Sequence, residues 1–289
     1  MTPLRQRMLE DMQLRGLAAR TQESYLAAIQ QLAIHYAKSP DLITDEEVRQ
    51  YFLYLVNVKR LAPNTVNVAL NAVKFLYTYT LLRPWPFRDL IRPALPLKLP
   101  VVLSVEEVWQ ILDHVRLPHY RVCLSVIYSC GLRLLEGVRL QVSQIDSARM
   151  QLHIRGGKGN KDRAIPLPER TLLLLRAHWL THRNPVWLFP GRSPNGFERR
   201  SASAPMHESA LQKAFRRAVQ EVGLNKPACV HSLRHSWATH LLESGVSVRV
   251  LQLWMGHTSP TTTAIYTHLT QHAEQAAATA LERLTAGLP

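Results

Sequence analysis

The 289-residue chain carries 35 Lys and Arg side chains against 21 Asp and Glu, a formal net charge of +14 at pH 7. Hydrophobic residues make up 46% of it, which is a globular composition able to bury a sizeable core. The charge favours a polyanionic partner, either nucleic acid or an anionic membrane surface. Because no apolar run approaches the ~20 residues of a membrane span and no signal peptide opens the chain, we expect no membrane partner.

The sequence also lacks the motifs of metal, disulfide and ATP chemistry. Cys123, Cys130 and Cys229 are an odd number without C-x-x-C spacing, so they indicate neither a disulfide framework nor a zinc site. The 13 histidines do not form H-E-x-x-H, and no G-x-x-x-x-G-K-S/T loop is present. We therefore expect reduced thiols in a bacterial-type cytoplasm and a function that needs no metal, ATP or other cofactor.

Residues 1–83 have the pattern of a small helical domain. A basic amphipathic stretch covers residues 1–38, residues 44–47 form a capping box, and a further helix starts at Pro63. The inner face of that helix is expected to hold Val66, Leu70, Val73 and Tyr77. The outer faces carry the basic residues Arg15, Arg20, Lys59, Arg60 and Lys74. Each one alone is most simply a solvated charge, but as a group they fit a DNA-contacting surface better.

A proline-rich linker, residues 84–103, follows this domain. Five prolines fall within residues 83–100, among basic side chains. Proline fixes φ and removes a hydrogen-bond donor, so the segment is expected to be extended. We place the domain boundary here, with the linker suited to cross a phosphate backbone.

Residues 104–289 are expected to form a second, mostly helical domain with a small sheet. A capping box at residues 104–107 opens it, and an apolar helix over 120–130 stops at Gly131. Two alternating runs, 150–154 and 162–167, flank a Gly-rich turn and predict a β-hairpin. Helices follow over 168–182, up to Gly223, and along the last twenty residues. The predicted fold class is therefore mainly α (α+β) with a small antiparallel sheet.

Several polar residues of this domain suit the cleavage of a phosphodiester without a metal, which needs cations, a nucleophile and an acid. Arg133 and Arg234 are each expected at the edge of a helix. The planar guanidinium group of arginine binds phosphate bidentately. His231 and His257 can donate to phosphate oxygens or shuttle protons near neutral pH. Each has a simpler alternative: a surface charge for Arg133, core packing for His231 and a helix cap for His257.

The nucleophile and the acid have separate candidates. The phenol of Tyr266 leaves phosphorus more readily than an alkanol because its pKa is about 10. Lys158 lies in the Gly-rich turn and can reach into a groove as a mobile acid. Lys161 competes with it in the same turn, and either lysine could be merely solvated. Tyr266 could also be a core residue, as we expect for Trp237 and Trp254.

Four boxes of the sequence together resemble a known family. They are residues 131–136, residues 157–163, residues 231–235, and Gly256-His257 with Tyr266 nine residues after the histidine. In this order they resemble the signature boxes of the tyrosine recombinases, the phage-integrase-like and Xer-like site-specific DNA recombinases. Any one box alone is weak, whereas the ordered set is highly specific. The chain departs from the family in Leu134, Leu135 and Gly137 around Glu136, and in Trp254-Met255 before Gly256.

The resemblance implies a recombinase with a helical, SAM-like core-binding domain and a catalytic domain, which together form a two-domain DNA clamp. The residues that would bind and activate the scissile phosphate are Arg133, His231, Arg234 and His257. Lys158 would protonate the leaving 5′ oxygen, Tyr266 would form the 3′-phosphotyrosyl intermediate, and Glu136 would support the arginine box. Lys161 and Arg163 are expected to make weaker DNA contacts.

The resemblance also implies the partners. The substrate would be double-stranded recombination sites, with strands exchanged through a Holliday junction and no small-molecule substrate. The protein would be a monomer or dimer when free and a homotetramer on two paired sites, in the bacterial cytoplasm with the nucleoid. Integration, transposition and dimer resolution remain open. A DNA-binding accessory protein and a type IB topoisomerase-like enzyme are the alternatives; the complete residue set argues against the first, and the boxes and the linker position against the second.

Overall fold

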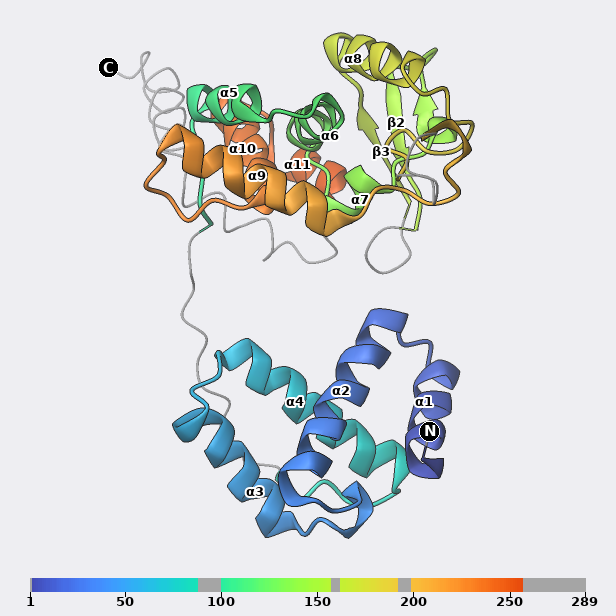
Figure 1. Cartoon of the computed structure of the whole chain (residues 1–289), viewed down its shortest axis with the longest axis vertical. Coiled ribbons are helices and arrows are strands. Elements are labelled where there is room, and N and C mark those ends of the chain that lie inside the picture. Colours follow the sequence, from blue (N-terminus) through green and yellow to red (C-terminus); the bar gives the residue numbers. More distant parts are fainter. Residues whose placement is uncertain (1, 88–99, 157–161, 192–198, 257–289) are drawn as a thin grey trace, which may run out of the picture. The chain divides into compact units, whose positions relative to one another are not determined.

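The computed structural model describes residues 2–87, 100–156, 162–191 and 199–256 (Figure 1). The chain divides into two units, Met1–Lys98 and Leu99–Pro289. Each has a hydrophobic core of its own. The hairpin tip with Lys158 and Lys161, the segment with His257 and Tyr266, and the expected terminal helix lie outside the described residues.

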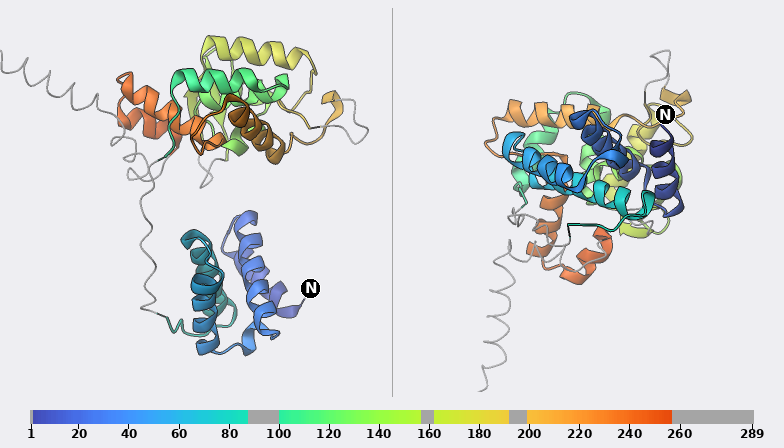
Figure 2. Two further views of the ribbon diagram at one scale, coloured as in Figure 1. Left: turned by 60° about the vertical axis from the view of Figure 1, so that its left-hand side comes forward. Right: turned by 90° about the horizontal axis from the view of Figure 1, so that it is seen from below.

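The first unit is a bundle of helices, visible from two further directions in Figure 2. Its elements are α1 (Pro3–Leu14), α2 (Ala19–Tyr36), η1 (Pro40–Leu42), α3 (Asp45–Leu53), η2 (Tyr54–Val58), α4 (Pro63–Phe75) and η3 (Leu76–Thr80). The basic stretch 1–38 is thus two helices, separated by a turn at Gly16. The capping box at Thr44 is confirmed, because Thr44 and Glu47 each satisfy the other's backbone N–H.

The core of this unit follows the helical periodicity of the sequence. The four residues expected on the inner face of the helix from Pro63 are all buried. The last of them, Tyr77, lies in η3, a π-helical turn that continues α4. The Tyr77 hydroxyl donates to Asp45 at the start of α3 over 3.0 Å, which joins two helices of the bundle.

The second unit is mostly helical with one small sheet. Its elements are α5 (Val105–His114), α6 (Pro118–Ser129), α7 (Leu134–Val138), η4 (Val142–Gln144), β1 (Ile145–Asp146), β2 (Gln151–Ile154), β3 (Arg163–Pro166), α8 (Glu169–Leu180), η5 (Arg199–Ser201), α9 (Glu208–Val222), α10 (Val230–Glu243) and α11 (Val248–Met255). The strands are antiparallel in the order β1-β2-β3, and α8 runs beside the sheet in Figure 1. The expected fold class, mainly helical with a small antiparallel sheet, is confirmed.

The predicted hairpin is β2 and β3, in the register that pairs Ile154 with Arg163. The third strand, β1, adds two residues to the other edge of β2. The N-terminal capping box of α5 is confirmed at Ser104 and Glu107. Within the described ranges, no helix is long and apolar enough to cross a membrane.

Helix α6 lies in the centre of the second core. Leu124, Val126 and Ile127 have no solvent exposure, because α6 contacts α5, α7, α8, α9 and α10. It ends at a turn in which Gly131 has φ 57°. This turn directs the chain into α7 and places Arg133 at the N-terminus of that helix.

A smaller core cluster joins α10 to α11. It contains Trp237 and Met255, with Trp254 packed against it. The expectation that Trp237 is a core residue is confirmed by its burial, and Trp254 is partly buried at the same cluster. The packing fixes the C-terminal end of α11 beside α10.

Candidate active site

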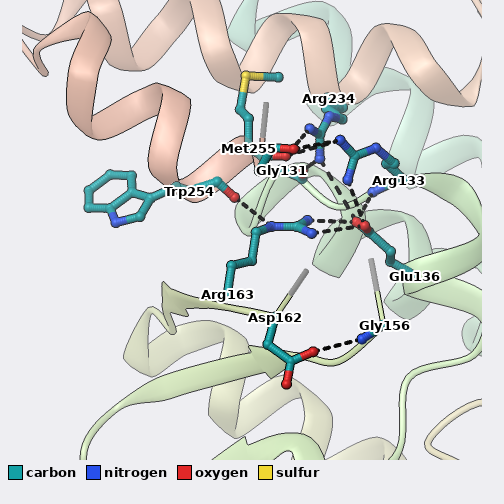
Figure 3. Close-up of polar contacts among 10 residues, drawn as sticks. Gly131, Arg133, Glu136, Gly156, Asp162, Arg163, Arg234, Trp254 and Met255 are labelled. Carbon is teal, nitrogen blue, oxygen red and sulfur yellow. Dashed lines mark hydrogen bonds and ion pairs between the residues drawn. The ribbon is translucent and has the colours of Figure 1, made fainter. Parts of the chain in front are cut away.

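Three of the six predicted catalytic residues lie in the described part of the chain: Arg133, His231 and Arg234. The structure brings the two arginines together with Glu136 and Arg163 beside the end of α11 (Figure 3). Lys158, His257 and Tyr266 lie outside the described residues, so their roles stay predictions. The structure therefore describes the predicted phosphate-binding arginines and His231, but not the predicted nucleophile or acid.

Glu136 is the common partner of the arginines. Its carboxylate accepts from Arg133 Nη1 at 2.8 Å and from the Arg133 backbone N–H at 2.8 Å. It also accepts from Arg163 Nη1 at 2.9 Å and Nη2 at 2.7 Å, a bidentate pair. Arg234 Nη1 lies 3.9 Å from the same carboxylate. A single carboxylate thus orients two guanidinium groups and approaches a third.

Glu136 is held in its charged form. Burial by itself raises the pKa of this carboxyl, but the hydrogen bonds and charge of Arg163, with the hydrogen bonds from Arg133, outweigh burial and lower the pKa to about 2. Three guanidinium groups around one ionised carboxylate leave an excess of positive charge. Such an excess at a partly buried site favours an anionic ligand.

The end of α11 supplies the other acceptors. Arg163 Nε donates to the carbonyl of Trp254 at 2.7 Å, and Arg234 Nη2 donates to that of Met255 at 2.7 Å. Arg133 Nη2 lies 3.2 Å from the Met255 oxygen and 3.4 Å from that of Gly256. The last carbonyls of a helix lack partners within the helix and form the negative end of its dipole, so guanidinium groups stabilise this end.

Arg234 is the most buried of the three arginines. The side chain is 1% exposed, and its Nη1 donates to the Gly131 carbonyl at 2.5 Å. Arg234 therefore connects the turn before Arg133 to the end of α11. A charged side chain is buried to this extent only when it is paired and hydrogen-bonded, and these contacts meet that condition.

His231 lies in the first turn of α10. Its ring packs edge-on against the ring of His235, with centroids 4.5 Å apart. Although the residue reaches solvent, the protein around its ring and the charges of Arg234 and Arg133 lower its pKa, against the opposing effect of Glu136. The neutral imidazole is thus favoured near neutral pH, and it can accept a proton.

The position of Arg163 differs from its expected role as a DNA contact. Its side chain is 7% exposed, and its guanidinium is engaged with Glu136 and Trp254. A phosphate contact needs an accessible guanidinium, so this geometry does not favour direct DNA binding. The sequence showed only that Arg163 begins the second strand of the hairpin, and nothing in it indicated a contact with Glu136. The neighbouring Asp162 accepts the Gly156 N–H at 2.8 Å.

The five basic residues expected to contact DNA from the first unit are all exposed. Arg15 stacks over the ring of Tyr79 at 4.2 Å, and Lys59 lies 5.7 Å from the ring centre of Tyr54. Arg20 pairs with Glu23 at 3.4 Å in a solvent-exposed ion pair. Exposed cations of this kind are available to phosphates, and their contact with DNA stays a prediction.

The departures around Glu136 and Gly256 are accommodated by packing. A Cβ at Gly137 would lie 2.5 Å from Ile127 Cγ1, so the absence of a side chain lets α7 pack closely on α6. Met255 is fully buried in the cluster with Trp237, and it contributes to the site through its carbonyl oxygen. In the part of the chain that the structure describes, no group of three or more His, Cys, Asp or Glu could hold a metal ion.

Comparison with known proteins assigns both units to one family. Residues 102–273 match the model of the phage integrase family, and residues 4–87 match that of the phage integrase N-terminal SAM-like domain. A putative integrase/recombinase of Sinorhizobium fredii, y4qK, is 43% identical over 92% of this chain and 84% of its own length. Tyrosine recombinase XerA of Pyrococcus furiosus is 32% identical over 82% of this chain and 82% of its own.

A solved structure shares the fold. The Tn1549 transposon integrase, solved in complex with transposon right end DNA, is similar with a TM-score of 0.72 over 98% of this chain and 100% of that chain, at 19% identity. The likeness of fold agrees with the sequence matches, which cover both units. The chain therefore belongs to the phage integrase family of tyrosine recombinases, and it is an enzyme that breaks and rejoins DNA at specific sites.

Proposed function

We propose that this recombinase holds the scissile phosphate of its DNA site with Arg133, His231, Arg234 and His257 and attacks it with Tyr266. The observation that carries the proposal is the convergence of Arg133 and Arg234 on the Met255 carbonyl, at 3.2 and 2.7 Å. Met255 is followed by Gly256 and His257, and Tyr266 lies nine residues further on. Both guanidinium groups are therefore bound to the end of α11, and the proposed nucleophile follows this helix in the sequence.

The proposed reaction conserves the number of phosphoester bonds. The Tyr266 oxygen attacks phosphorus, and its proton passes to the neutral imidazole of His231. A 3′-phosphotyrosyl bond forms as the bond to the 5′ oxygen breaks, and Lys158 supplies the proton to that oxygen. The 5′-hydroxyl of a partner strand then attacks the phosphotyrosine and gives its proton to Lys158. As the bond to Tyr266 breaks, His231 returns its proton to the Tyr266 oxygen. No ATP is consumed, because the energy of the broken bond is kept in the phosphotyrosine.

The proposed ligand is double-stranded DNA that carries the recombination site. The net charge of +14 and the exposed cations of the first unit support it. Strand exchange between two paired sites requires four cleavages, so we propose a homotetramer on DNA, formed from a monomer or dimer, in the bacterial cytoplasm at the nucleoid.

A covalent-adduct assay tests this function. A cognate site, recovered by selection from random duplexes, is prepared with a nick next to the scissile phosphate so that the cleaved strand diffuses away. The wild-type protein is expected to form an adduct that survives denaturation, and Tyr266→Phe is expected to bind the same DNA without forming it. An adduct with Tyr266→Phe would show that another residue is the nucleophile.

The adduct assay, a plasmid-relaxation assay and a two-site recombination assay together separate the alternatives. A wild-type protein that binds the site tightly and forms no adduct would be a DNA-binding accessory protein. Relaxation of supercoiled plasmids whether or not they carry the site would indicate a topoisomerase-like enzyme. Recombination between two sites, with a Holliday junction that accumulates when one partner is Tyr266→Phe, is the result expected here.

A further inference from the structure

Arg163 is the one arginine of the cluster outside the predicted catalytic set, and it connects three segments. It begins β3, so it lies at the foot of the hairpin. Two of its nitrogens bind Glu136 in α7, and the third binds the Trp254 carbonyl in α11. A planar guanidinium holds three acceptors at fixed angles, whereas an ammonium group acts as a point charge. These contacts therefore require an arginine specifically.

The end of α11 is shaped around this side chain. Gly256 has φ 62°, and a Cβ at this position would lie 2.9 Å from Cδ of Arg163. Any other residue would push Arg163 away or open the end of the helix. Arg163 therefore packs closely against the C-terminal end of α11. This end directly precedes His257 in the sequence.

Arg163 also anchors the strand that leaves the hairpin tip. It pairs with Ile154 on β2. The preceding residue, Asp162, accepts the Gly156 N–H at 2.8 Å. Lys158 falls between these two residues in the sequence. The first residue of β3, five positions after Lys158, is thus attached to the carboxylate that orients Arg133.

The charges of the cluster show what Arg163 supplies. It occupies both oxygens of Glu136, at 2.9 and 2.7 Å, while Arg133 binds Oε1 and Arg234 stays 3.9 Å from Oε2. Without Arg163, the carboxylate would be neutralised by Arg133 and Arg234 alone. Their guanidinium groups would then be drawn toward Glu136 and would offer less positive potential to a phosphate.

We propose that Arg163 is a positioning residue for recombination. It fixes Arg133 through Glu136 and the end of α11 through the Trp254 carbonyl, without touching DNA. This inference rests on the proposed function of Arg133 and Tyr266. It assigns Arg163 to the rate of strand cleavage rather than to DNA affinity, and the two roles differ in their measurable consequences.

The first test compares Arg163→Lys with Arg155→Lys. Arg155 is exposed and directly follows the partner strand β2, so it is a matched control for the substitution and for the hairpin. With saturating nicked site, Arg163→Lys is expected to slow adduct formation by roughly tenfold to a hundredfold, the scale of a small misplacement of catalytic groups. Its Kd and the dependence of that Kd on salt should match wild type, and Arg155→Lys should cleave at the wild-type rate.

Two outcomes of that comparison overturn the proposal. Cleavage by Arg163→Lys at the wild-type rate would remove the positioning role. Arg163→Gln removes the charge that Arg163→Lys keeps. Weaker binding by Arg163→Gln with a shallower salt dependence and an unchanged cleavage rate would make Arg163 a phosphate contact, because each lost phosphate contact lowers the slope by about one. A thermal melt of each variant, compared with wild type, identifies a variant that has lost its fold.

The second test asks whether Arg163 acts through Glu136. Arg163→Lys, Glu136→Gln and the double variant form a mutant cycle on the cleavage rate. Since both changes disrupt the same contact, the double variant should be slowed by much less than the product of the two single effects. A double variant slowed by the full product of the two single effects would show that Arg163 and Glu136 act independently. That result would contradict the proposal that Arg163 acts through Glu136.

A third measurement needs neither DNA nor cleavage. Amide hydrogen exchange across residues 248–256 should be faster in Arg163→Lys than in wild type and unchanged in Arg155→Lys, because the α11 terminus loses an anchor. Equal exchange in all three proteins would contradict the proposal. If wild type formed no adduct, the proposed function would fail, while this measurement would still decide whether Arg163 fixes α11.

Discussion

Arg133 and Arg234 donate to the same carbonyl oxygen, that of Met255, at 3.2 and 2.7 Å. The shared acceptor sets the separation of the two guanidinium groups before any ligand binds. Groups arranged in advance stabilise developing charge without the cost of reorganisation during the reaction. The stability of this cluster should therefore be measurable in the protein without DNA.

The first prediction concerns acid and Glu136. The pKa of this carboxyl is about 2 in the folded protein against an ordinary 4.5, so its ionised form stabilises the fold above the ordinary value, and that contribution is lost as pH falls toward 2. The lowered pKa corresponds to about 3 kcal/mol. Urea unfolding at several pH values from 6 to 3 should show the advantage of wild type over Glu136→Gln shrinking with acid. Parallel curves for the two proteins would contradict this.

The second prediction concerns the turn before Arg133. Gly131 has φ 57°, and a Cβ there would lie 2.2 Å from the Trp237 ring. Gly131→Ala should lose about 1–2 kcal/mol for the left-handed backbone and a further ~1–3 kcal/mol for overpacking. Gly223→Ala is the control, since Gly223 has φ 71° and open space around it. Equal losses of unfolding free energy in the two variants would show that Trp237 yields without cost.

The third prediction concerns the exposed cations of the first unit. Lys74→Gln should weaken binding to all DNA sequences alike, and it should reduce the slope of log affinity against log salt by about one. Arg7→Gln, a change at an exposed cation of α1 outside the predicted surface, is the matched control. Titrations at several salt concentrations measure both slopes. A Lys74→Gln slope equal to that of wild type would remove Lys74 from the DNA surface.

The fourth prediction concerns His231. Its pKa lies below the ordinary 6.5 because of burial and the charges of Arg234 and Arg133. If the neutral ring accepts the tyrosine proton, the cleavage rate at low DNA concentration should fall as pH drops through this lowered pKa and stay level above it, since that rate reports the free enzyme. The acid limb should vanish in His231→Gln, at a lower overall rate. A limb that persists in the variant would assign it to another group.

The sequence predicted the elements whose boundaries depend on local chemistry. The capping boxes at Thr44 and Ser104 could be predicted because they have a fixed spacing. A Thr or Ser at the start of the helix and a Glu three residues later each bind the other's backbone N–H. The turn at Gly131 and the pairing of β2 with β3 followed in the same way from glycine and alternation. Strand β1 was not predicted, since two residues carry no periodic signal.

The partners within the site were less accessible to sequence reasoning. Arg133, Glu136, His231 and Arg234 were named from their boxes, but the acceptor role of the Trp254 and Met255 carbonyls has no side-chain signature. Arg163 was expected among the weaker DNA contacts, as the last residue of the box at 157–163. Its burial against Glu136 depends on how β3 and α7 meet, which only the tertiary structure determines.

The anchored end of α11 has a consequence for the choice of target. Tyr266 is ten residues beyond Gly256, and a chain of ten residues spans at most ~33–36 Å. Successive phosphates of one DNA strand are only ~3.4 Å apart along the axis, so chain length by itself permits the phenol to reach any of many phosphates. The hydrogen-bonded guanidinium groups remove that ambiguity. Under the proposed function, the phosphate that the arginine cluster binds is the one that the tyrosine attacks, so the cluster selects the position of cleavage.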